Sequence, residues 1–123
     1  MNGKERVFAA LRHEESDRVP WVPFAGVHAG RLKGFSAQDV LKDSDKLYQS
    51  LLAVNELYQP DGQPVIFDLQ VEAEILGCEL LWQDETPPSV VSHPLLSGQG
   101  LDRLELPCEE DGRLPLIIDV MRR

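Results

Sequence analysis

The amino-acid sequence predicts an α/β fold with parallel strands, on the basis of three observations. Helical and extended patterns alternate along the chain, which is typical of α/β domains. Residues 64–67 read PVIF, a run too short and too apolar to have a face in water, as in a parallel strand buried on both sides. One carboxylate, Asp68, follows this run directly. Side chains just past the carboxyl end of such a strand face the ligand crevice, so we expect Asp68 to lie in a functional pocket.

The first elements expected are a helix and a strand. Asn2, with Glu5 three residues later, forms a variant of the capping box, and the apolar face that follows predicts a helix ending near His13. A strand is expected at residues 19–24. Pro23 lies within it and donates no ladder hydrogen bond, so its position would have to face a gap in the sheet.

Three glycines at four-residue intervals lie in residues 25–36, AGVHAGRLKGFS. Such glycines indicate unusual backbone angles or the close approach of another group, and we interpret this segment as a loop. Ser36 and Asp39 then give a second capping signal, for a short helix that runs to about Lys42.

A longer helix follows, capped by either Asp43 or Ser44, and the turn at residues 60–62 ends it. Its apolar face comprises Leu47, Leu51, Val54 and Tyr58. The elements expected after Asp68 are a helical turn ending at Gly77, two extended segments, a long loop and a final helix, at residues 71–76, 79–83, 89–93, 97–113 and 114–121.

The chain stops at residues 121–123, in the middle of the last helical pattern. Complete domains seldom end inside an amphipathic helix without a breaker. We therefore expect residues 1–123 to be one N-terminal segment of a longer domain. The cap of this last helix is expected at Gly112 or in the loop before Pro115.

The composition excludes several classes of partner. The net charge of −9 argues against nucleic acid, because phosphate binding needs a basic face. No stretch approaches the roughly 20 apolar residues of a membrane helix, and the N-terminus lacks the apolar core of a signal peptide. Cys78 and Cys108 form neither a CxxC metal motif nor a disulfide framework. Two reduced thiols in a cytoplasmic protein are the simplest expectation.

Three motifs carry a resemblance to a known family. They are the opening NGKERVFAALRHEESDRVPW, the tripeptide Ala29-Gly30-Arg31, and Phe67-Asp68 with Gly77 nine residues later. With these three motifs in this order, the chain resembles the N-terminal part of the uroporphyrinogen decarboxylase superfamily. The resemblance implies a (β/α)8 barrel, which needs about 250 residues. This chain would supply its first two strands, whose unpaired edges predict self-association or pairing with a missing barrel half.

The resemblance also implies roles for three residues. Asp68 matches the catalytic aspartate of the decarboxylases, which accepts pyrrole N–H groups and offsets developing positive charge. The alternative is that Asp68 caps the helical turn after it. Arg31 is a candidate clamp for a carboxylate or sulfonate, or else a surface arginine. His28 is a candidate substrate ligand, or else a solvated loop histidine.

One departure from the decarboxylases favours one branch of the family over another. They carry an essential arginine four residues before the arginine of the AGR motif, where this chain has Val27, and His28 stands where a glutamine is usual. Valine cannot bind a propionate. The favoured function is therefore that of the methyltransferase-like branch, which moves a methyl group between a corrinoid and a thiol or folate-type acceptor. The substrate would be a small molecule or a corrinoid protein.

The methyltransferases of this superfamily hold zinc through one His and two Cys in the later half of the barrel. Those positions lie beyond Arg123, and His93 has no partner at ligand spacing, so we assign no metal to this chain. The isolated piece is expected to be inert. Two alternatives stay open: decarboxylation of uroporphyrinogen in porphyrin biosynthesis, and a non-catalytic binding or assembly module.

Overall fold

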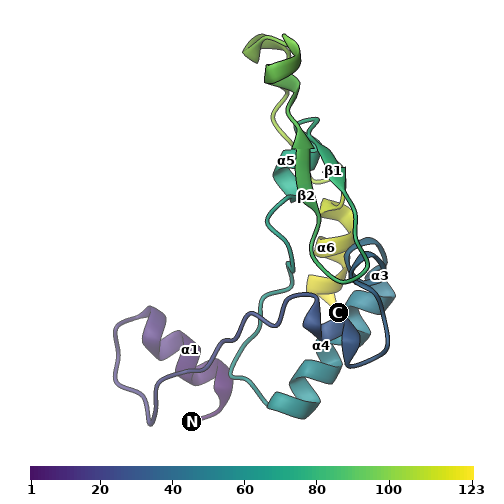
Figure 1. The fold of residues 1–123 in the computed structure, drawn as a ribbon. Coiled ribbons are helices and arrows are strands. Elements are labelled where there is room, and N and C mark those ends of the chain that lie inside the picture. Colours follow the sequence, from purple (N-terminus) through teal and green to yellow (C-terminus); the bar gives the residue numbers. More distant parts are fainter.

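The computed structural model describes residues 1–123 in three parts, a first helix, a helical body and an arm (Figure 1). The first helix is α1 (Gly3–Leu11). The body consists of α2 (His28–Arg31), α3 (Ala37–Lys42), α4 (Ser44–Tyr58) and α6 (Leu114–Arg122). The arm consists of α5 (Val71–Ile75), β1 (Glu79–Leu81), β2 (Ser89–Ser92) and two 3₁₀ turns, η1 (Pro94–Ser97) and η2 (Leu101–Arg103).

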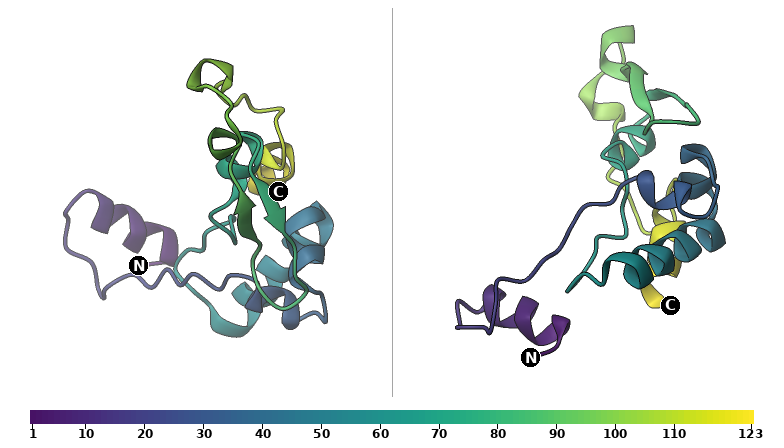
Figure 2. Two further views of the ribbon diagram at one scale, coloured as in Figure 1. Left: turned by 45° about the horizontal axis from the view of Figure 1, so that its top comes forward. Right: turned by 60° about the horizontal axis from the view of Figure 1, so that its bottom comes forward.

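The predicted first helix is confirmed, together with its capping box. The Asn2 side chain accepts a hydrogen bond from the Glu5 amide at 2.9 Å, and the Glu5 carboxylate accepts one from the Asn2 amide at 2.8 Å. Two donors that a helix start would leave unpaired are thereby satisfied. Figure 2 shows α1 standing apart from the helical body, joined to it by drawn-out connections.

The helical body is the hydrophobic core of the chain, and α4 lies at its centre in contact with α2, α3 and α6. The helices predicted to begin after Ser36 and after Asp43 or Ser44 are confirmed as α3 and α4. Of the two caps considered for α4, the structure selects Asp43, whose carboxylate accepts from the amides of Asp45 and Lys46. The core side chains are Ala29, Val40, Leu41, Leu47, Leu51, Val54, Phe67 and Val120.

The loop predicted at residues 25–36 is in part helical, because α2 forms one turn within it. Gly30 explains why the turn packs here. A β-carbon on Gly30 would lie 2.3 Å from Val40 Cγ2 and 3.2 Å from the Phe35 carbonyl oxygen. Only glycine allows α2 to approach α3 this closely, so the glycine signal for close approach applies at this position.

The prediction of strands at residues 19–24 and 64–67 is wrong for this chain, because neither segment belongs to a sheet. The two segments do lie side by side and run in the same direction. The Trp21 carbonyl accepts a hydrogen bond from the Asp61 amide at 2.9 Å. The rings of Phe24 and Phe67 pack edge to face, with their centroids 6.4 Å apart. A ladder needs repeated backbone bonds on several residues. The bond from Trp21 reaches Asp61, before the second segment, and no backbone hydrogen bond joins residues 19–24 to residues 64–67. The prolines in both segments remove donors.

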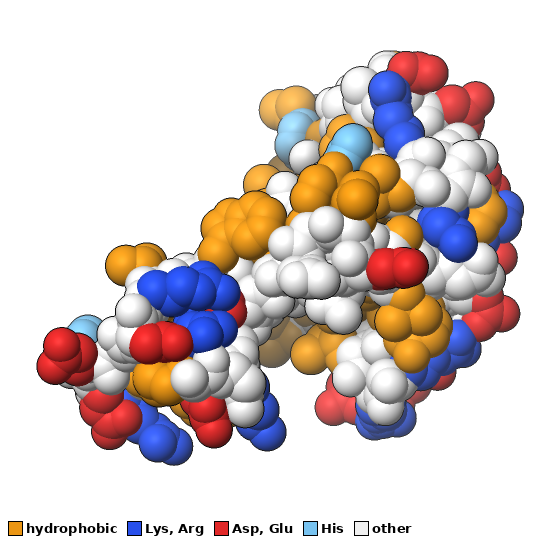
Figure 3. Space-filling view, turned by 90° about the horizontal axis from the view of Figure 1, so that it is seen from below, with side chains coloured by type: hydrophobic (Ala, Val, Ile, Leu, Met, Phe, Trp, Pro, Cys, Tyr) orange, Lys and Arg blue, Asp and Glu red, His pale blue; other side chains and the backbone are white.

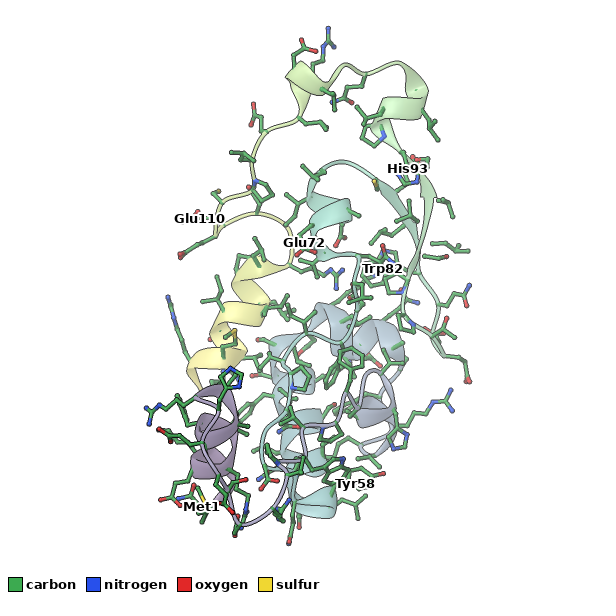
Figure 4. The ribbon with its side chains drawn as sticks, turned by 90° about the vertical axis from the view of Figure 1, so that its left-hand side faces the viewer. Met1, Tyr58, Glu72, Trp82, His93 and Glu110 are labelled. Atoms are coloured by element: carbon green, nitrogen blue, oxygen red, sulfur yellow. The ribbon has the colours of Figure 1, made fainter.

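The only sheet is the antiparallel pair β1–β2, which confirms the two extended segments predicted in the arm. Trp82 follows β1 and docks the arm on the body, as Figure 4 shows. Its ring lies 3.9 Å from Lys42 Nζ and 4.9 Å from Arg113 Cζ. The loop predicted at residues 97–113 contains one 3₁₀ turn, η2, while η1 begins before it.

The predicted final helix is confirmed as α6, and it packs against α4. Its N-cap is Arg113, which makes no capping hydrogen bond with its side chain. Of the two positions expected for this cap, Gly112 or the loop before Pro115, the structure selects the second. None of the helices has the length and apolar character needed to cross a bilayer.

Candidate functional site

Asp68 lies at the end of residues 64–67, where the helical body meets the arm, and only 1% of its side chain is exposed. Its Oδ2 accepts a hydrogen bond from Arg113 Nη1 at 2.7 Å. Its Oδ1 accepts from the Gln70 amide at 2.7 Å and from Arg113 Nη2 at 3.4 Å. A buried carboxylate needs such partners, because an unpaired buried charge is strongly destabilising.

Arg113 connects this carboxylate to three other parts of the chain. Its Nε donates to the Glu74 carboxylate of α5 at 2.7 Å, and its Nη1 lies 3.4 Å from the Leu41 carbonyl oxygen of α3. The guanidinium also faces the ring of Trp82. Burial acts to lower the pKa of Arg113, but the hydrogen bonds to Asp68 and Glu74 outweigh it and raise this pKa above its ordinary value.

The space beside Asp68 is small. The cavity that Asp68 and Arg113 line with apolar neighbours has a volume of about 10 Å³, which is room for about one water molecule. A larger hollow of about 520 Å³ lies between the end of α5 and residues 99–106, and Glu74 lines it. In this conformation the Asp68 carboxylate is thus closed to a ligand of porphyrin or corrinoid size.

Arg31 and His28 lie on α2 and are both exposed. Arg31 Nη2 forms an ion pair with Glu85 Oε2 at 2.5 Å, and His28 Nε2 lies 3.0 Å from the Tyr58 hydroxyl. No hydrogen bond or ion pair joins either residue to Asp68. The three predicted site residues are therefore not brought into one contact network within residues 1–123.

Sequence reasoning missed Arg113, the charged partner of Asp68, and Glu74, which pairs with Arg113 in turn. Arg113 ends the loop predicted at residues 97–113, 45 residues from Asp68, and Glu74 lies in the helical turn predicted at residues 71–76. An arginine just before an amphipathic helix is too common a signal to reveal such a contact. Only the packing of α5 and α6 brings the three charged groups together.

The expectation that His93 has no partner is also corrected. His93 Nδ1 lies 3.5 Å from the Cys78 sulfur, because the antiparallel pair brings the start of β1 beside the end of β2. Residues 15 positions apart in the sequence thus become neighbours. No set of three or more His, Cys, Asp or Glu side chains is arranged to hold a metal ion.

These features were compared with known proteins. A family model described as uroporphyrinogen decarboxylase (URO-D) matches residues 2–123. The chain belongs to the uroporphyrinogen decarboxylase family. The match spans all three motifs on which the resemblance was founded, and the predicted family is thereby confirmed.

Two curated relatives within the family are methyltransferases. The chain is 28% identical to the methylcobamide:CoM methyltransferase MtbA of Methanosarcina acetivorans and to that of Methanosarcina mazei. Each match covers 97% of this chain and 36% of the relative. The chain therefore spans about a third of the length of these relatives.

A solved structure described as a methyltransferase from Methanosarcina mazei resembles this chain with a TM-score of 0.82. The match covers 99% of this chain and 37% of the solved one, at 24% identity, which establishes the fold alone. Family and structural likeness together imply the barrel fold, of which residues 1–123 contain helices and one small sheet.

Proposed function

We propose that residues 1–123 form the N-terminal part of a (β/α)8 barrel enzyme that moves a methyl group between a corrinoid and a thiol-type acceptor. The observation that carries this proposal is the likeness to methylcobamide:CoM methyltransferases along 97% of the chain. Val27 supports the same branch, because it stands where the decarboxylases of the family have an arginine.

The two drawn-out segments at residues 19–24 and 64–67 are proposed to become neighbouring barrel strands. They already run in the same direction. Exposed apolar side chains on the two segments or just after them are free to be buried by further strands: Val19, Trp21, Val22, Phe24, Ile66 and Leu69. Strands from the remaining barrel would supply the missing ladder partners. Pairing with such a second part, or self-association without it, follows from this arrangement.

Arg31 and His28 are proposed to bind substrate at the barrel mouth. A guanidinium can bind a carboxylate or sulfonate with two hydrogen bonds. The present partner of Arg31 is Glu85, which is 80% exposed, and such an exposed pair contributes little stability. An anionic acceptor could therefore replace Glu85 at low cost.

Asp68 is proposed to supply a fixed negative charge beneath this mouth. Its burial and its three hydrogen bonds support a preorganised charge rather than a mobile side chain. The family's thiol-activating zinc does not fit the residues of this chain, so its ligands would come from the rest of the barrel. Residues 1–123 alone are accordingly proposed to be inactive.

The proposal is tested by reassembly. The chain is mixed with a polypeptide comprising the part of the Methanosarcina mazei relative that lies beyond the matched region. Demethylation of methylcobalamin with coenzyme M as acceptor is then followed by absorbance. We expect turnover from the complex and none from either part alone. A stable one-to-one complex without demethylation would contradict methyl transfer, and robust turnover by the isolated chain would contradict its inertness.

The same complex separates the alternatives. Incubation with uroporphyrinogen should yield no coproporphyrinogen, whereas its formation, with loss on Asp68→Asn, would establish the decarboxylase function instead. A pull-down that recovers only this chain would count against a binding or assembly module.

A further inference from the structure

We propose that Arg113 is a positioning residue that fixes the Asp68 carboxylate, so that the two side chains act as one unit. The catalytic consequence rests on the proposed function, whereas the positioning itself can be measured on residues 1–123. Nothing in the three motifs assigns a role to Arg113, which lies outside all of them.

The hydrogen bonds of Asp68 carry the first step. A carboxylate has about four lone-pair positions, and three are occupied here. Arg113 occupies two of them, one on each oxygen, and the Gln70 amide occupies the third. Arg113 therefore sets the plane of the carboxylate, which the Gln70 amide, bound to Oδ1 alone, cannot do.

The second step is that Arg113 is itself held. Nε is bound to Glu74 at 2.7 Å, and Trp82 covers the guanidinium. The side chain of Arg113 is only 11% exposed. Because Glu74 of α5, Trp82 after β1 and the Leu41 carbonyl of α3 each contact the guanidinium, it cannot turn without disturbing all three contacts.

The third step concerns access. One lone pair of Asp68 Oδ2 has no partner, and the adjoining cavity has room for about one water. Asp68 thus acts on a substrate as a fixed charge whose position Arg113 determines. A side chain that had to swing out to the substrate would break both bonds to Arg113.

The experiment follows amide hydrogen exchange of Gln70 in the isolated chain, because this amide reports directly on the position of Asp68 Oδ1. Arg113→Gln should raise the exchange rate of Gln70 at least about fivefold relative to Val54, a buried core position of α4. Arg113→Lys keeps the charge and should restore part of the protection. An unchanged ratio of Gln70 to Val54 exchange in Arg113→Gln would overturn the proposal.

Arg123→Gln is the matched control. Arg123 ends the same helix and also pairs with two carboxylates, Asp45 and Asp119, but at the surface. It should leave the Gln70 to Val54 ratio unchanged. If Arg113→Gln does not fold, Arg113→Lys is compared with Arg123→Gln instead. Of these two variants, only Arg113→Lys should raise the ratio of the Gln70 exchange rate to the Val54 exchange rate.

The reassembled enzyme provides the second readout. There Arg113→Gln and Asp68→Asn should each lower kcat about tenfold or more, with KM little changed, and the double variant should be no slower than Asp68→Asn alone. If Arg113→Gln kept full activity while Asp68→Asn was impaired, the proposal that Arg113 acts through Asp68 would be overturned. If the wild-type complex shows no methyl transfer while the Gln70 result holds, the proposed function fails and the positioning role stands.

Discussion

The Asp39 side chain, at the start of α3, has two structural roles, one in its own helix and one toward α4. Its carboxylate accepts hydrogen bonds from the amide and the hydroxyl of Ser36 and also pairs with Lys46 of α4. The hydrogen bond from Lys46, followed by those from Ser36, lowers the pKa of Asp39 to about 2. One carboxylate therefore caps a helix and joins it to the next.

This pKa shift predicts an acid-dependent loss of stability. The pKa of Asp39 is about 2 in the folded chain and about 3.9 when unfolded, so the stabilisation is complete above pH 4 and is lost as the pH falls through 2. Asp39→Asn should flatten the decline of the thermal unfolding midpoint between pH 4 and pH 2. Asp102→Asn, at an exposed site without an ion pair, should leave that decline unchanged.

At the scale of elements, the arm is held to the body through Trp82. Lys42 at the end of α3 and Arg113 before α6 both place cations against its ring. Cation–π contacts of this kind add to the apolar burial of an indole. These contacts make Trp82 a packing residue of the structure.

Removal of this anchor should loosen the arm. Trp82→Leu should lower the free energy of unfolding by about 1–3 kcal/mol, because the indole contacts and both cation–π interactions are lost. Chemical denaturation followed by circular dichroism measures the change. Trp21→Leu provides the comparison, since Trp21 is 48% exposed and should cost far less. Equal costs for the two substitutions would mean that Trp82 is not the anchor.

At the scale of the whole molecule, most of the core lies in the helical body, and many apolar side chains elsewhere are exposed to solvent. Figure 3 shows hydrophobic side chains gathered between the α1 end and the body. Val19 is 85% exposed and Leu69 is 83% exposed. Apolar surface of this kind, beside segments with unpaired backbone groups, favours association.

We therefore expect the isolated chain to self-associate through the drawn-out segments. In sedimentation velocity, the variant Val19→Lys with Leu69→Lys should remain monomeric at concentrations where the wild type forms larger species. The control carries the same two charges on the tip of the arm, as Leu96→Lys with Leu101→Lys, at positions 84% and 73% exposed. Association that is lost in the control and kept in the first variant would contradict this arrangement.

The sequence by itself determined the features that depend on neighbouring residues. Asn2 with Glu5 and Ser36 with Asp39 set two helix starts, since a cap involves residues three positions apart. The apolar period of α4 likewise reports one face of one helix. The family could be predicted too, because its motifs are short and local.

Only the tertiary structure decided whether residues 19–24 and 64–67 form strands and what surrounds Asp68. A strand is defined by the backbone hydrogen bonds of its ladder, and within this chain no backbone hydrogen bond joins the two segments. Asp68 meets Arg113 across 45 residues, a contact made by the packing of α6 beside the arm. Apolar pattern and acid placement identify which residues are buried, but the partners of a buried charge are set by elements far away in the sequence.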